Sequence, residues 1–118
     1  MSLVRFESGA GTGLATWTST RVPEVGARYS VEFDIDGVID RHCAREGTEG
    51  AFRIGHTDSE TKLEGLLESV DSDGTGYFRL APDSLTMLDT SDGWDRPGAW
   101  LEITLSVDRL MMTPVGGA

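Results

Sequence analysis

The chain of 118 residues has the length of one domain, so we expect a single domain over residues 1–118. Twenty acidic and ten basic residues give a net charge of −10, which disfavours nucleic-acid binding and favours a basic protein partner. The single cysteine excludes an internal disulfide and favours a reducing, cytoplasmic location, and no apolar run approaches the ~20 residues of a membrane-spanning helix.

The N-terminal third is predicted to be extended. Its clearest segment is Arg28–Asp36, where apolar and polar residues alternate strictly, as in a strand with one buried face. The glycine-rich segment Ser8–Gly13 and the connector Arg21–Ala27 separate strands, and Asp36-Gly37 is expected to turn the chain into a return strand. The strands predicted in this third are Leu3–Glu7, Leu14–Thr20, Arg28–Asp36 and Val38–Asp40.

The centre of the chain, Leu63–Leu80, is predicted to be a β-hairpin. Its turn contains Asp73-Gly74, a dipeptide typical of a type I′ turn with positive φ at both central positions. A helix is the alternative for the first arm, because four apolar residues also have helical spacing and a capping box precedes them. Gly65 and the surrounding strands favour a strand. The four apolar residues are Leu63, Leu66, Leu67 and Val70, and the capping box is Thr57-x-x-Glu60.

Short strands are also predicted in the rest of the chain. Pro82 ends the second arm of the hairpin, because proline lacks a donor for the ladder. The polar segments Arg41–Gly50 and Thr90–Gly98 are predicted loops, and Asp58–Thr61 is predicted to be an acidic turn or the start of the alternative helix. The further strands are Ala51–Thr57, Ser84–Asp89, Ala99–Val107 and Leu110–Thr113.

This pattern of about seven to nine short strands, without a convincing long helix, indicates an all-β domain. We predict a small antiparallel β-barrel, partly open, of the OB or SH3-like kind. A two-sheet β-sandwich is the alternative architecture.

The most informative side chain for binding is Trp94, which lies in a predicted turn loop. It either covers the end of the barrel or stays exposed as a contact residue. Tryptophan and the neighbouring Arg96 are residue types that concentrate binding energy at interfaces, and Asp92 and Asp95 add negative charge. We therefore predict that Trp94, Arg96, Asp92 and Asp95 contact a protein partner.

His56, Asp58 and Glu60 alternate at the end of a predicted strand. In an extended chain these side chains share one face, where a histidine beside a carboxylate is suited to acid–base chemistry. We count His56 and Asp58 among the candidate binding residues.

The richest set of potential metal ligands surrounds His42 and Cys43, but these two residues are adjacent and lack zinc-ligand spacing. A second match, Asp71-x-Asp73-x-Thr75-Gly76, resembles the opening of a calcium loop, but Pro82 stands where a bidentate glutamate is needed. We therefore expect no metal site and no cofactor. The other potential ligands around His42 are Asp34, Asp36, Asp40 and Glu46.

Three functional hypotheses follow. The first is a non-enzymatic interaction module whose loops contact a protein partner. The alternative is a small enzyme or small-ligand-binding barrel that uses His42, His56 and nearby carboxylates. The third is an auxiliary domain that acts as a homodimer, in which the C-terminal strand with Met111-Met112 pairs across a dimer axis.

Overall fold

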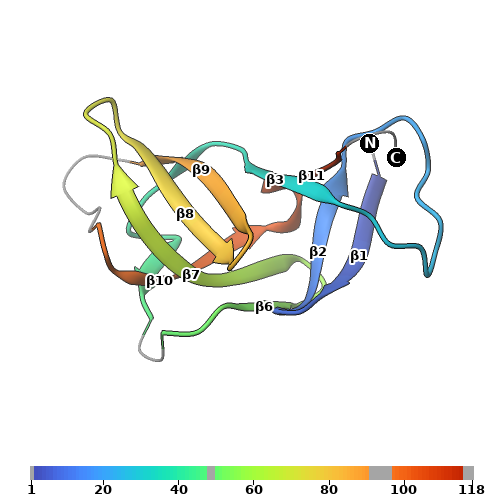
Figure 1. The fold of residues 1–118 in the computed structure, drawn as a ribbon, viewed down its shortest axis with the longest axis horizontal. Coiled ribbons are helices and arrows are strands. Elements are labelled where there is room, and N and C mark those ends of the chain that lie inside the picture. Colours follow the sequence, from blue (N-terminus) through green and yellow to red (C-terminus); the bar gives the residue numbers. More distant parts are fainter. Residues whose placement is uncertain (1, 48–49, 91–96, 116–118) are drawn as a thin grey trace.

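The computed structural model describes residues 2–47, 50–90 and 97–115. These residues form a single eleven-stranded sheet that curls strongly into a half-barrel (Figure 1). Their one helical segment is the 3-10 turn η1 (Val107–Arg109), so the prediction of an all-β chain is confirmed. The strands are β1 (Ser2–Ser8), β2 (Gly11–Trp17), β3 (Val31–Ile35), β4 (Val38–Ile39), β5 (Ala44–Glu46), β6 (Arg53–His56), β7 (Glu60–Val70), β8 (Thr75–Ala81), β9 (Ser84–Thr90), β10 (Trp100–Ser106) and β11 (Leu110–Pro114).

The longest strand, β7, organises the sheet. It pairs with β6 and β10 along its first half and with β8 along its second half. Buried residues alternate with exposed or half-buried ones from Thr61 to Leu67, so the strand prediction is confirmed and the helical alternative is wrong. Leu66 lies on the outer face opposite Trp100, which explains why the apolar residues also fitted helical spacing.

The hairpin between β7 and β8 has a different turn from the predicted one. A type I′ turn at Asp73-Gly74 requires positive φ at both residues. Gly74 has φ +88°, but only glycines have positive φ among the described residues, so Asp73 does not, and the type I′ conformation is excluded. Gly74 N–H donates to Asp71 O at 3.0 Å, and Asp71 N–H donates to Thr75 O at 2.8 Å. These bonds form a three-residue loop that ends in a glycine bulge, a common hairpin connection.

Two glycines permit the close strand contacts of the curled sheet. A Cβ atom on Gly65 of β7 would lie 2.1 Å from the carbonyl oxygen of Arg79 on β8. Gly11 has φ +138°, and a Cβ atom there would lie 2.0 Å from Ile54 O on β6. Gly11 is already the first residue of β2, so the predicted glycine turn is shorter than expected.

The strands β3 and β4 stand at opposite ends of the strand order but follow one another in the chain. The predicted return strand is therefore wrong: β4 does not pair with β3 but continues onward to pair in parallel with β9. Arg109 fixes the bend between them, because its Nε donates to Asp36 O at 2.7 Å and its Nη2 donates to Val38 O at 3.0 Å.

Parallel pairs occur at three places, between β4 and β9, β2 and β11, and β2 and β6. The remaining pairs are antiparallel, so the predicted antiparallel sheet is correct only in part. The OB or SH3-like architecture stays a prediction.

The C-terminal strand β11 lies inside the sheet, between β3 and β2. Because both of its edges are paired, this strand is not free to pair across a dimer axis, and the homodimer itself stays a prediction. On the other side of β2 lies β1, so the first and last strands flank β2.

The core fills the inner side of the curl. Leu101, Ile103 and Leu105 of β10 are buried in strict alternation, as predicted for Ala99–Val107. Trp100 points to the outer face and packs on Phe52, with ring centroids 5.1 Å apart. The buried hydrophobic residues are Ala15, Trp17, Ile39, Ala44, Ile54, Leu63, Leu67, Phe78, Leu80, Leu88, Leu101, Ile103, Leu105, Leu110 and Met112.

Candidate functional site

The predicted binding loop lies outside the described residues. Asp92, Trp94, Asp95 and Arg96 belong to segment 91–96, so their contact with a partner stays a prediction. The other tryptophans, Trp17 and Trp100, pack as expected of residues on strands.

The predicted polar face of His56, Asp58 and Glu60 depends on an extended chain, but the chain reverses here. β6 ends at His56 and β7 begins at Glu60, and Thr57 N–H donates to Glu60 O at 2.9 Å. All three side chains are exposed, and His56 Nδ1 lies 2.8 Å from Thr57 O. The condition for a shared strand face is not met, and the binding roles of His56 and Asp58 stay predictions.

The carboxylates of the calcium-like segment form hydrogen bonds within the hairpin. Tyr77 donates its hydroxyl proton to Asp71 Oδ2 at 2.7 Å, and Asp71 thereby raises the pKa of Tyr77. Thr75 N–H donates to Asp73 Oδ1 at 3.0 Å, which lowers the pKa of Asp73. In the part of the chain that the structure describes, no three His, Cys, Asp or Glu side chains are grouped as metal ligands would be.

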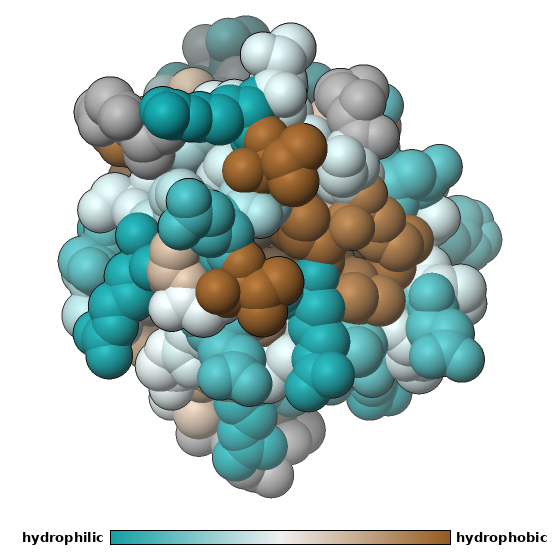
Figure 2. Space-filling view, turned by 90° about the vertical axis from the view of Figure 1, so that its right-hand side faces the viewer, coloured by the Kyte–Doolittle hydropathy of each residue, from teal (hydrophilic) through white to brown (hydrophobic). Residues whose placement is uncertain are grey.

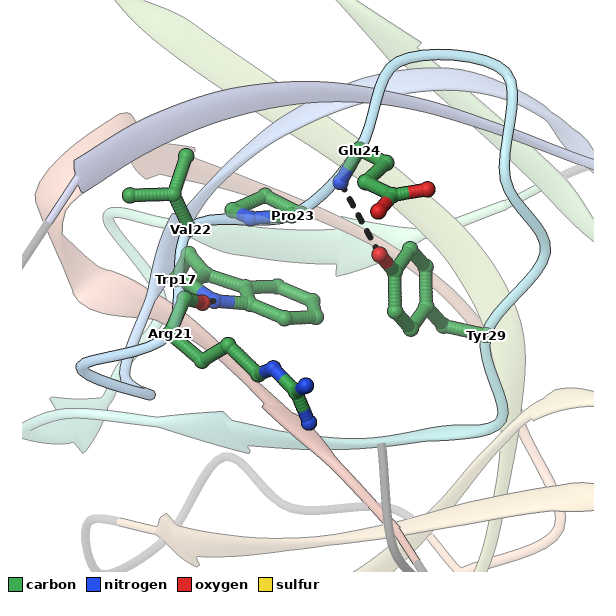
Figure 3. Close-up of a pocket in the computed structure, with 6 residues that line it drawn as sticks. All are labelled: Trp17, Arg21, Val22, Pro23, Glu24 and Tyr29. Carbon is green, nitrogen blue, oxygen red and sulfur yellow. Dashed lines mark hydrogen bonds between the residues drawn. The ribbon is translucent and has the colours of Figure 1, made fainter.

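The connector of residues 18–30, between β2 and β3, encloses a pocket of about 190 Å³, the connector pocket. Figure 3 shows the Trp17 indole between Pro23 and Arg21, with Tyr29 facing its edge. The two aromatic rings are 5.3 Å apart in an edge-to-face arrangement. Trp17 Nε1 donates to Arg21 O at 2.8 Å, and Glu24 N–H donates to Tyr29 Oη at 2.9 Å. The side-chain polar groups of both aromatics therefore hold the connector in place.

The same end of the molecule carries exposed hydrophobic side chains. Val22 and Val25 of the connector are 77% and 106% exposed, and Leu3 and Val115 are also exposed. Leu3 lies next to the register pair of Ser2 with Trp17, and Val115 N–H donates to Ser30 O at 2.8 Å. Figure 2 shows hydrophobic side chains at this end among hydrophilic ones. We name Leu3, Val22, Val25 and Val115 the connector surface.

A second pocket, of about 360 Å³, lies over β5, β10 and β7, and we name it the cationic pocket. Arg45 Nε donates a hydrogen bond to Glu102 Oε1 at 2.9 Å, and Arg45 Nη2 forms an ion pair with the same oxygen at 2.8 Å. Lys62 Nζ lies 3.7 Å from the same carboxylate oxygen. The lining residues are Arg41, His42, Cys43, Ala44, Arg45, Lys62, Glu102 and Thr104.

The turn before β5 holds one edge of the cationic pocket. His42 N–H donates to Asp40 Oδ1 at 2.9 Å, and this bond lowers the pKa of the Asp40 carboxyl group. The Cys43 thiol lies 3.4 Å from Asp40 O. Of the potential ligands around His42, only His42 and Cys43 line this pocket, and the loop predicted for Arg41–Gly50 includes the short strand β5.

Sequence reasoning missed both the connector surface and the cations of the second pocket. Val22 and Val25 lie in an unpatterned connector, so no periodicity marks them as exposed contacts. Arg45 and Lys62 are 17 residues apart in sequence and meet only through their pairing with β10.

In comparisons with known proteins, no family model, no curated protein and no solved structure matches this chain. None of the described residues belongs to a helix with the length and hydropathy needed to cross a bilayer.

Proposed function

We propose that the protein is a non-enzymatic interaction module that binds a protein partner through the connector surface. The observation that carries this proposal is that, among the described residues, four of the seven large exposed hydrophobic ones lie at one end of the half-barrel. Water-exposed hydrophobic groups that gather on one side of a molecule are typical of interaction sites. This surface replaces the undescribed loop with Trp94 as the main contact in our proposal.

The hydrogen bonds that hold the connector support the same role. The bonds of Trp17 and Tyr29 hold the segment that displays Val22 and Val25, so little conformational entropy is lost when a partner binds. A connector without such contacts would bind more weakly, because its ordering would oppose binding.

The net charge of −10 favours a partner with basic groups around an apolar contact. Glu24 of the connector and Glu32 of β3 place carboxylates near the connector surface. Complementary charge accelerates association, and salt reduces this effect. We therefore expect the affinity for the partner to fall as the salt concentration rises, and we place the interaction in the cytoplasm.

The test uses the double substitution Val22→Ser and Val25→Ser, with Val38→Ser as the matched control. Val38 is also an exposed valine, but it lies on β4. Proteins captured by the wild-type chain from its native host are compared with those captured by each variant. A captured protein is then purified, and its affinity for all three chains is measured at low and high salt.

We expect the double variant to bind the partner at least tenfold more weakly, while Val38→Ser binds as the wild type does. A partner that binds the double variant with unchanged affinity would contradict the proposal. The absence of any captured protein that distinguishes the double variant from the control would contradict it as well.

A further inference from the structure

The cationic pocket contrasts with the acidity of the whole chain. Three of the chain's ten basic residues line this one pocket, whereas the net charge is −10. Arg41 directly precedes β5, Arg45 lies on β5 and Lys62 lies on β7, so two stretches that are distant in sequence supply the cations. This convergence does not follow from composition, because acidic residues outnumber basic ones two to one.

Strand register creates the convergence. Glu102 of β10 is paired with Arg45 of β5, and the neighbouring Thr104 is paired with Lys62 of β7. Side chains at paired positions lie on the same face of a sheet. Arg45, Glu102, Thr104 and Lys62 therefore line one wall of the pocket.

The charges of the lining do not cancel. Glu102 is its only carboxylate, and it already contacts Arg45 and Lys62. With His42 neutral, three cations and one anion leave a formal charge of +2 in the lining.

Two further carboxylates, those of Glu64 and Asp40, lie near the pocket. Glu64 is in register with Glu102 on one side and with Arg53 on the other, so a cationic residue stands next to it on the same face of the sheet. Asp40 accepts the His42 N–H bond. Neither carboxylate belongs to the pocket lining.

We propose that the cationic pocket binds a small dianion of the phosphate class, either inorganic phosphate or a phosphate monoester. Arginine guanidinium groups bind phosphate oxygens through paired hydrogen bonds, and lysine adds a point charge. The Thr104 hydroxyl in the lining can donate a further hydrogen bond. A volume of about 360 Å³ also leaves room for the organic part of a monoester.

The negative field of the protein does not prevent this binding. At physiological ionic strength charges are screened over about 8 Å, so the cations that touch the ligand outweigh distant carboxylates. This proposal uses none of the residues of the connector surface, and its failure would leave the proposed function untouched.

The test is a titration of the full chain with sodium phosphate at pH 7.5, followed by amide chemical shifts at constant ionic strength. We expect saturable shifts at residues 41–45 and 102–104. Arg41→Gln and Lys62→Gln should each weaken binding about tenfold, because each removes a charge-assisted hydrogen bond. The control is Arg5→Gln on β1, which removes the same charge elsewhere and should change the affinity less than twofold.

Glycerol phosphate, titrated in the same way, distinguishes the two sources of the dianion. Tighter binding of glycerol phosphate than of inorganic phosphate assigns the site to a monoester, and the reverse order assigns it to inorganic phosphate. Two results would overturn the proposal: shifts no larger than those caused by sodium chloride at equal ionic strength, or equal affinities of Arg41→Gln and Arg5→Gln. The dispersion of the remaining amide signals shows that each variant is folded.

Discussion

The connector pocket and the cationic pocket differ in what their polar groups contact. In the connector pocket, the Trp17 indole N–H and the Tyr29 hydroxyl bond to the backbone of the connector. In the cationic pocket, Arg41 and Lys62 keep charge beyond what Glu102 neutralises. The polar groups of the first pocket therefore hold the connector in place, whereas the second pocket keeps cationic groups that we propose bind an anion. The volumes of the two pockets do not distinguish these roles. What distinguishes them is whether the polar groups are already bonded to the backbone or still carry uncompensated charge.

The largest expected effect concerns the connector pocket. Trp17→Ala removes a buried indole and its hydrogen bond, so the free energy of unfolding should fall by about 3–5 kcal/mol. Urea denaturation followed by circular dichroism measures this loss. Arg45→Gln in the cationic pocket is the comparison, and it should change stability by less than about 0.5 kcal/mol because the Arg45 side chain is 75% exposed. Equal losses in the two variants would remove the distinction between the pockets.

A smaller effect is expected for Tyr29→Phe. The substitution keeps the aromatic contact with Trp17 but removes the hydroxyl that accepts the Glu24 N–H bond. Unfolding free energy should fall by about 1 kcal/mol, the net value of one hydrogen bond. The same denaturation experiment measures it, and protease cleavage within residues 18–30 should become faster. An unchanged cleavage rate would show that this bond does not hold the connector.

The smallest effect is a pH dependence at the edge of the cationic pocket. The hydrogen bond from His42 lowers the pKa of Asp40 from its ordinary value of 3.8. Asp40 therefore contributes stability above pH ~4, and this contribution is lost as the pH falls through the lowered pKa. The stability difference between the wild type and Asp40→Asn should shrink as the pH falls from 5 toward 2. A difference that stays constant over this range would contradict the assignment.

Other carboxyl groups with lowered pKa do not disturb this comparison. The hydrogen bond from Arg79 lowers the pKa of Glu68, and the hydrogen bonds from Thr75 lower the pKa of Asp73. Both groups are present in the wild type and in Asp40→Asn. Their shared contribution cancels when the two stabilities are subtracted at each pH.

Local patterns in the sequence predicted most of the strands. The alternation in Ala99–Val107 reports burial on one face and needs no knowledge of neighbouring strands, and β10 follows it. The alternation in Arg28–Asp36 was also correct, although β3 begins only at Val31. The turn type at Asp73-Gly74 was wrong because the bond between Asp71 and Thr75 makes the loop one residue longer.

Features that depend on distant strands were not predictable in this way. The parallel pairing of β4 with β9 depends on the curl of the whole sheet. The cationic pocket depends on the register of three strands, and single-sequence periodicity contains no information about register between distant segments. The connector surface was missed for another reason, since exposed valines in an irregular segment have no periodic signature.

The position of β2 between the first and the last strand has a consequence for biosynthesis. Trp17 is in register with Ser2 on one side and with Met112 on the other. A nascent chain that still lacks β11 cannot complete the pairing of β2 on this side. Native structure should thus form only after β11 has been synthesised and has left the ribosome, in a late and concerted step whose rate is limited by the wide sequence separation of its contacts, on the order of milliseconds to seconds.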